Sequence, residues 1–198
     1  MRGIGKRVAV YCASSKQCAP EYHTAARRLG EVLADGGFTV VYGGGAVGSM
    51  GALAGGALAR GGRVVGVLPR FMDELEWGRE GLSELQLVDD MRVRKEKMLH
   101  GSEAVVALPG GCGTFEELFE VLTLKRLGLY LRPIILVNTR RFFDPLQELL
   151  ACAIRERFMD ERHGAGVMWQ VVPEPEDVPR AIAEAPPWTS DAQGFAVL

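Results

Sequence analysis

The stretch EAVVALPGGCGTFEEL (103–118) joins a short apolar run to three closely spaced glycines and then to a segment with helical periodicity. An apolar run that ends in glycines and continues as a helix is the repeating unit of an α/β protein. The glycines leave the backbone bare at the point where the helix starts. The stretch therefore predicts a strand, a tight turn and a helix in direct succession.

The same alternation of apolar runs and helical spacing continues along the 198 residues. It favours an α/β fold with a parallel sheet covered by helices on both faces. Residues 186–198 lack periodicity, so we expect one domain over residues 1–185 and a flexible C-terminal tail at 186–198. Strands are expected at residues 7–13, 38–45, 63–69, 85–88, 103–110, 133–138 and 169–173, and helices at 20–37, 49–62, 91–102, 114–128, 144–158 and 175–185.

Composition argues against several classes of protein. Hydrophobic residues make up 47% and charged residues 24% of the chain, and the net charge of −2 gives no support for a nucleic-acid partner. No apolar run approaches the roughly 20 residues needed to cross a bilayer, so we expect no membrane association. The first residues lack a secretory signal pattern, and the four cysteines form no C-x-x-C pair. We therefore expect reduced thiols and a cytoplasmic location.

The glycine turn has two interpretations. Gly110, Gly111 and Gly113 precede a helix, and a helix N-terminus attracts anions through its free N–H groups and its dipole. The turn matches neither the G-K-[ST] of a P-loop nor G-x-G-x-x-G. From spacing alone, a phosphate cradle and an ordinary tight turn between strand and helix are equally supported.

Two neighbouring glutamates follow this turn. Thr114 and Glu117 have the spacing of a capping box, in which each side chain binds the backbone N–H of the other. Sequence physics alone favours that structural role for Glu117. Glu116 is expected to be a solvated acid in the first helical turn, where the dipole stabilises negative charge.

MRVRKEKM (91–98) carries a second group of charged residues. Arg92 and Lys95 are three residues apart on one helical face, and Arg94 and Lys97 share another. A solvated basic face is the usual explanation of such a pattern.

PGGCGTFEE (109–117) and MRVRK (91–95) together resemble the signature of the Lonely guy (LOG) family of nucleoside 5'-monophosphate phosphoribohydrolases. That signature is P-G-G-x-G-T-x-x-E preceded by M-x-x-R-K, and VYGGGAVGSMG (41–51) resembles the second glycine turn of the family. The resemblance implies a single-domain, Rossmann-like, three-layer doubly wound fold in a homodimer. It implies hydrolysis of the N-glycosidic bond of a nucleoside 5'-monophosphate, either a cytokinin riboside monophosphate or AMP, without metal or cofactor.

The resemblance also implies roles for individual residues. Arg94 and Glu117 become the catalytic pair. The resemblance thus selects Glu117 rather than Glu116 for catalysis, and favours a catalytic role for Glu117 over a capping role. The family's T-W-x-Q-L-G is replaced by TLKRLG (123–128), which puts a preference for a prenylated base in question. Substrate contacts are implied for Ser14, Gly43, Gly44, Gly45, Glu76, Met91, Lys95, Gly110, Gly111, Gly113, Thr114 and Thr123.

Two other functions compete with hydrolysis. A carrier of a nucleotide or of molybdenum cofactor needs the glycine cradle but has no need of Arg94 and Glu117. A lysine decarboxylase that uses pyridoxal phosphate needs a Schiff-base lysine, and Lys95 is the lysine expected near the site. Metal catalysis is not expected, because the three histidines are scattered and form no H-E-x-x-H motif.

Overall fold

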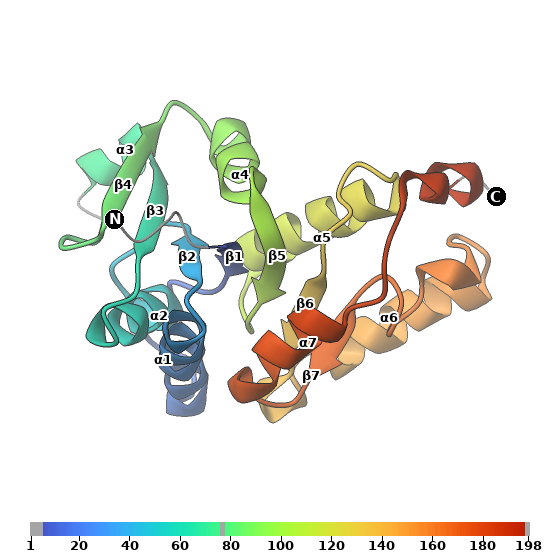
Figure 1. Ribbon diagram of the computed structural model, residues 1–198, viewed down its shortest axis with the longest axis horizontal. Helices are drawn as coiled ribbons and strands as arrows, with labels where there is room; N and C mark the ends of the chain where they lie inside the picture. The colour runs from blue at the N-terminus through green and yellow to red at the C-terminus, as the bar shows by residue number, and fades with distance from the viewer. Residues whose placement is uncertain (1–5, 76–77, 197–198) are drawn as a thin grey trace.

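The computed structural model describes residues 6–75 and 78–196, and in these it shows a parallel seven-stranded sheet (Figure 1). The strand order is β4-β3-β2-β1-β5-β6-β7, so successive strands add to one side up to β4 and to the other side from β5. The α/β prediction is confirmed. The strands are β1 (Arg7–Tyr11), β2 (Thr39–Tyr42), β3 (Val64–Pro69), β4 (Glu84–Val88), β5 (Ser102–Ala107), β6 (Ile134–Val137) and β7 (Gln170–Val172).

Helices cover both faces of the sheet, which gives three layers (Figure 1). Helices α1 (Pro20–Asp35), α2 (Gly48–Ala59) and α7 (Val178–Glu184) pack on one face, where they share a core with Val8 and Val10 of β1. Helices α4 (Met91–Leu99), α5 (Cys112–Arg126) and α6 (Asp144–Arg155) pack on the other face, against Ala9 and Tyr11. Alternate β1 residues thus enter opposite cores, as expected for a strand buried on both sides.

The strands β1 and β5 lie side by side in the centre of the sheet. The order in which successive strands are added reverses between them. Chain segments that leave these two strands diverge to opposite sides, and a crevice forms at their carboxyl ends. The glycine turn after β5 lies at this position, as does the turn after β1.

Helix α5 begins at Cys112, two residues before the start predicted from the sequence. Helix α4 ends at Leu99 rather than at 102, and Gly101 follows with a φ of 68°. A short helix, α3 (Arg70–Glu74), directly follows β3 and buries none of its residues. Glu76, expected to contact substrate, lies outside the described residues.

The segment after residue 185 contacts the domain, which differs from the loose tail expected from its aperiodic sequence. The indole N–H of Trp188 donates to the Lys125 carbonyl of α5 at 2.8 Å. Ala192 is buried within a 3₁₀ helix, Ser190–Phe195. Packing by single residues needs no repeating pattern, so periodicity did not reveal it. The domain boundary at residue 185 stays a prediction.

No helix in the described parts of the chain is both long enough and apolar enough to span a membrane.

Candidate active site

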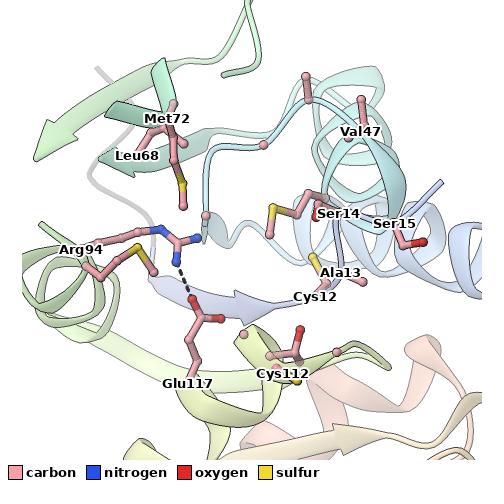
Figure 2. A pocket seen from close by; sticks show the side chains of 18 of the residues that line it. Cys12, Ala13, Ser14, Ser15, Val47, Leu68, Met72, Arg94, Cys112 and Glu117 are labelled. Carbon is pink, nitrogen blue, oxygen red and sulfur yellow. Dashed lines mark hydrogen bonds and ion pairs between the residues drawn. The ribbon is translucent and has the colours of Figure 1, made fainter. Parts of the chain in front are cut away.

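A cavity of about 710 Å³ opens at the carboxyl ends of the central strands (Figure 2). It lies at the crevice expected where the strand order reverses. Its walls come from the turns after β1 and β2, from the end of β3 and the helix α3 that follows it, and from the N-terminal parts of α2, α4 and α5. The lining residues are 12–16, 43, 45–47, 50, 68, 72, 91, 94, 111–114 and 117.

Arg94 and Glu117 meet at one wall of this cavity. The Arg94 Nη1 donates to Glu117 Oε1 at 2.7 Å, and both side chains are only 6% exposed. The Arg94 Nε also donates to the Val67 carbonyl of β3 at 3.1 Å. Figure 2 shows the two side chains approaching from α4 and α5, with the dashed bond between them. The sequence resemblance grouped these residues, and the structure brings them into contact.

Burial controls the ionisation of Glu117. Its pKa is raised above the ordinary glutamate value because it lies away from water, and the neighbouring Arg94 charge opposes part of this effect. Burial is also the main reason that the pKa of the Cys12 thiol is raised, and the Glu117 charge raises it further. The site therefore holds a carboxylate that takes up a proton more readily than one in water.

The capping box does not form. Helix α5 has Gly111 as its N-cap without a side-chain cap, and the Glu117 carboxylate binds Arg94 instead. Thr114 is buried with its side chain against Gly110, where an added Cβ would lie 2.1 Å from Thr114 Oγ1. Because the helix starts two residues early, Thr114 is not in the N-cap position that a capping box requires.

The glycine turn opens into the cavity. Gly111 and Gly113 both line it, and a Cβ added at either residue would meet no atom within 4 Å. The first turn of α5 thus presents bare backbone to open space at a helix N-terminus, the geometry that suits a phosphate. This observation favours the cradle over an ordinary tight turn.

Other predicted contacts fall into two groups. Ser14, Gly43, Gly45 and Met91 line the cavity with the residues already described. Gly44, Lys95, Gly110 and Thr123 are not among its lining residues.

Lys95 does not face the cavity. It forms ion pairs with Glu116 and Glu120 of α5, at 3.3 Å for Glu120. Adjacent helical positions point about 100° apart, so Lys95 turns toward α5 while Arg94 turns toward the cavity. The exposed Glu116 is thus a partner of Lys95 rather than a purely solvated acid.

Sequence reasoning missed part of the lining. Met50, Leu68 and Met72 form an apolar wall, and Lys16 rather than Lys95 is the lysine that lines the cavity. Figure 2 places Leu68 and Met72 on the opposite side of the cavity from Cys112. The available signal was their position, because Leu68 lies at the carboxyl end of β3, and Met50 and Met72 lie in the helices that follow β2 and β3.

Residues 6–75 and 78–196 contain no group of three or more His, Cys, Asp or Glu side chains suited to a metal ion.

Comparison with known proteins identifies relatives of this chain. The family model described as "Possible lysine decarboxylase" matches residues 50–182. The cytokinin riboside 5'-monophosphate phosphoribohydrolase LOG of Oryza sativa subsp. japonica is 41% identical over 157 residues, which cover 79% of this chain and 64% of that protein. The cytokinin riboside 5'-monophosphate phosphoribohydrolase of Rhodococcoides fascians is 41% identical over 159 residues, which cover 80% of each.

A solved structure shows the same fold at lower identity. The molybdenum cofactor carrier protein of Chlamydomonas reinhardtii aligns with a TM-score of 0.69 and 18% identity, over 91% of this chain and 97% of that chain. A structural likeness at that identity shows a shared fold and nothing more. The family model matches more than half of the sequence, which is enough to assign the family. The chain therefore belongs to the Lonely guy (LOG) family, whose family model carries the description "Possible lysine decarboxylase".

Proposed function

We propose that this protein hydrolyses the N-glycosidic bond of nucleoside 5'-monophosphates and releases the free base and ribose 5-phosphate. The observation that carries the proposal is the buried Arg94–Glu117 pair in the wall of a cavity that also contains a bare helix N-terminus. Relatives at 41% identity are named for this reaction on cytokinin riboside monophosphates.

Cleavage of the C1'–N bond develops positive charge on the sugar and negative charge on the departing base. Glu117 is the carboxylate that supports this step, by stabilising the cationic sugar or by activating water at C1'. Its Oε1 accepts from Arg94, and Figure 2 shows its second oxygen turned toward the space between Cys12 and Cys112.

Arg94 has a permanent charge and a rigid set of donors. One N–H is committed to the Val67 carbonyl and another to Glu117, which fixes the guanidinium plane. Arg94 therefore holds Glu117 in place. Its position beside the cavity also suits it to bind a ribose hydroxyl or to stabilise the departing base.

The 5'-phosphate binds at the first turn of α5, where Gly111 and Gly113 leave the backbone accessible. Anchoring the phosphate at this end supplies binding energy remote from the reacting bond and fixes C1' near the carboxylate. The apolar wall of Met50, Leu68 and Met72 then lies available for the base. Glu76 remains a proposed substrate contact from the resemblance.

The structure offers little support for a pyridoxal phosphate lysine. Lys95 is held by Glu116 and Glu120 away from the cavity, and Lys16 is exposed in the turn after β1. The carboxylate partners raise the pKa of Lys95, which is opposite to the change that activates a Schiff-base lysine, and Lys16 lies in water.

We further propose a cytoplasmic homodimer. The four cysteines are free, which suits a reducing compartment. Phe119 of α5, and Leu127, Leu129 and Leu131 after it, are exposed apolar side chains that a second copy would cover. Light scattering tests the dimer: Leu129→Glu is expected to shift the mass toward the monomer, and a wild-type monomer at micromolar concentration would refute it.

The test of function is product release from AMP, GMP, CMP and isopentenyladenosine monophosphate. Free base and ribose 5-phosphate in equal amounts support the proposal. The rates of release from the four nucleotides, compared with one another, give the base preference. Tight binding without turnover would favour a nucleotide carrier instead.

A further inference from the structure

Gly43, the first residue after β2, lies directly against the Arg94 guanidinium. A Cβ added at Gly43 would lie 1.9 Å from Arg94 Nη2 and 3.1 Å from its Cζ. The first distance is far below van der Waals contact, so any other residue at position 43 displaces the guanidinium or moves the strand end.

Displacement of this guanidinium is costly although arginine is a flexible side chain. Its Nε is bonded to the Val67 carbonyl and its Nη1 to Glu117, and the side chain is 6% exposed. A shift large enough to admit a methyl group breaks at least one of these bonds. The buried Glu117 then loses its counter-charge.

The neighbouring glycines are required for different reasons. Gly44 has a φ of 79°, a conformation that glycine adopts more readily than other residues. A Cβ at Gly45 would meet the flexible Met50 side chain, with its Sδ at 2.8 Å. Gly43 is not among the residues with positive φ, so its backbone accepts alanine. The demand for glycine at position 43 therefore comes chiefly from Arg94.

We propose that Gly43 is a positioning residue, whose missing side chain lets Arg94 lie beside the end of β2 and hold Glu117. The turn that resembles the family's second glycine turn thus serves the catalytic pair as well as the ligand. The consequence for turnover rests on the proposed function, whereas the effect on the Arg94–Glu117 contact does not.

The experiment is a carboxyl ¹³C NMR titration of Glu117 in substrate-free protein labelled at glutamate. The Glu117 signal is assigned by its loss in Glu117→Gln. Gly43→Ala and Arg94→Ala are each expected to raise the pKa of Glu117, because each removes the cation from beside it. The double variant is expected to match Arg94→Ala, since the methyl group then has no guanidinium to displace.

Gly55→Ala is the matched control, because its added Cβ meets atoms no closer than 3.6 Å and lies outside the cavity lining. It is expected to titrate as wild type. A wild-type titration in folded Gly43→Ala would overturn the proposal. So would a Gly43→Ala effect that is equally large without Arg94.

Kinetics add a second readout. Gly43→Ala is expected to lower kcat by about 100-fold, the typical cost of misplacing a catalytic group by about 1 Å, with a smaller change in KM. A rise in KM with kcat and the Glu117 titration unchanged would instead show that the methyl group only obstructs substrate, and would overturn the positioning role.

Failure to fold is also informative. If Gly43→Ala unfolds and the Gly43→Ala/Arg94→Ala variant folds, the clash with Arg94 is supported; if both unfold while Arg94→Ala alone folds, the proposal is wrong. Absence of wild-type turnover on any nucleotide would refute the proposed function alone, because the titration uses no substrate.

Discussion

The Arg94 Nη1 and the Glu117 Oε1 lie 2.7 Å apart although the two residues are 23 positions apart in the sequence. One comes from α4 and the other from α5, and both side chains are almost fully buried. A buried ion pair is weak evidence for stability, because desolvation offsets much of the attraction. At the wall of a cavity, the same pair is better explained by chemistry.

Replacement of the carboxylate tests this explanation. Glu117→Gln keeps the size of the side chain but removes its charge and its ability to act as a base. We expect kcat to fall by about 100-fold to 10,000-fold, the usual range for an acid–base group. The measurement is release of free base from nucleoside monophosphates.

Glu116→Gln is the matched control for that experiment. Its carboxylate pairs with Lys95 outside the cavity lining, so kcat and KM are expected to stay near wild type. Equal losses in the two variants would contradict the assignment of the reaction to Glu117.

The pH profile follows from the burial of Glu117. The pKa of this carboxyl is raised above the ordinary value of 4.5, and the proposed reaction uses its ionised form. As pH falls, protonation therefore begins earlier than for a glutamate in water. We expect the acidic limb of kcat/KM to have its midpoint above pH 4.5, measured where circular dichroism shows an intact fold. A midpoint at or below 4.5 would show that another group controls this limb.

The phosphate cradle is tested by adding a methyl group to it. Gly111 has a φ of −97°, which alanine adopts, and its new Cβ would project into open space. We expect Gly111→Ala to fold as wild type and to raise KM for nucleoside monophosphates by about 10-fold, a loss of about 1.4 kcal/mol. An unchanged KM would place the phosphate elsewhere. Binding of the nucleoside without its phosphate is expected to change less.

Lys125 links stability to pH. Its pKa is lowered from 10.5 to about 8 by burial, while its Nζ donates to the Arg132 carbonyl at 2.9 Å. Between these two pH values the unfolded chain binds more protons than the folded one, so the free energy of unfolding rises with pH. Below pH 8 the buried charge costs up to about 3 kcal/mol.

Lys125→Met removes this charge and also the bond to Arg132. The free energy of unfolding of the variant, relative to that of wild type, is expected to be highest below pH 8. This difference is expected to disappear by about pH 10.5. Urea unfolding at several pH values measures the difference. A difference that does not vary with pH would contradict the lowered pKa.

The fold was predictable because alternating apolar and helical segments leave few arrangements of a parallel sheet. The glycine turn and its helix were also foreseen, although α5 begins at Cys112 rather than at Thr114. That shift of two residues is why the capping-box interpretation of Glu117 failed. Helix starts depend on backbone conformation at glycines, which the sequence leaves open.

The pairing in the site was harder to predict from residue types alone. Arg94 and Lys95 are adjacent cations, yet one is buried against Glu117 and the other pairs with Glu116 and Glu120. Which one enters the cavity depends on the rotation of α4 against β3. The close approach of Gly43 to Arg94 likewise joins segments that are distant in sequence, and no local pattern reveals it.

The most direct test of the central claim is simultaneous measurement of both products from AMP and isopentenyladenosine monophosphate, with wild type and Glu117→Gln at equal concentration. We predict free base and ribose 5-phosphate in a 1:1 ratio from wild type, and at least a 100-fold slower release from the folded variant. Bound nucleotide that stays intact with wild type, or equal rates for the two proteins, would contradict the account.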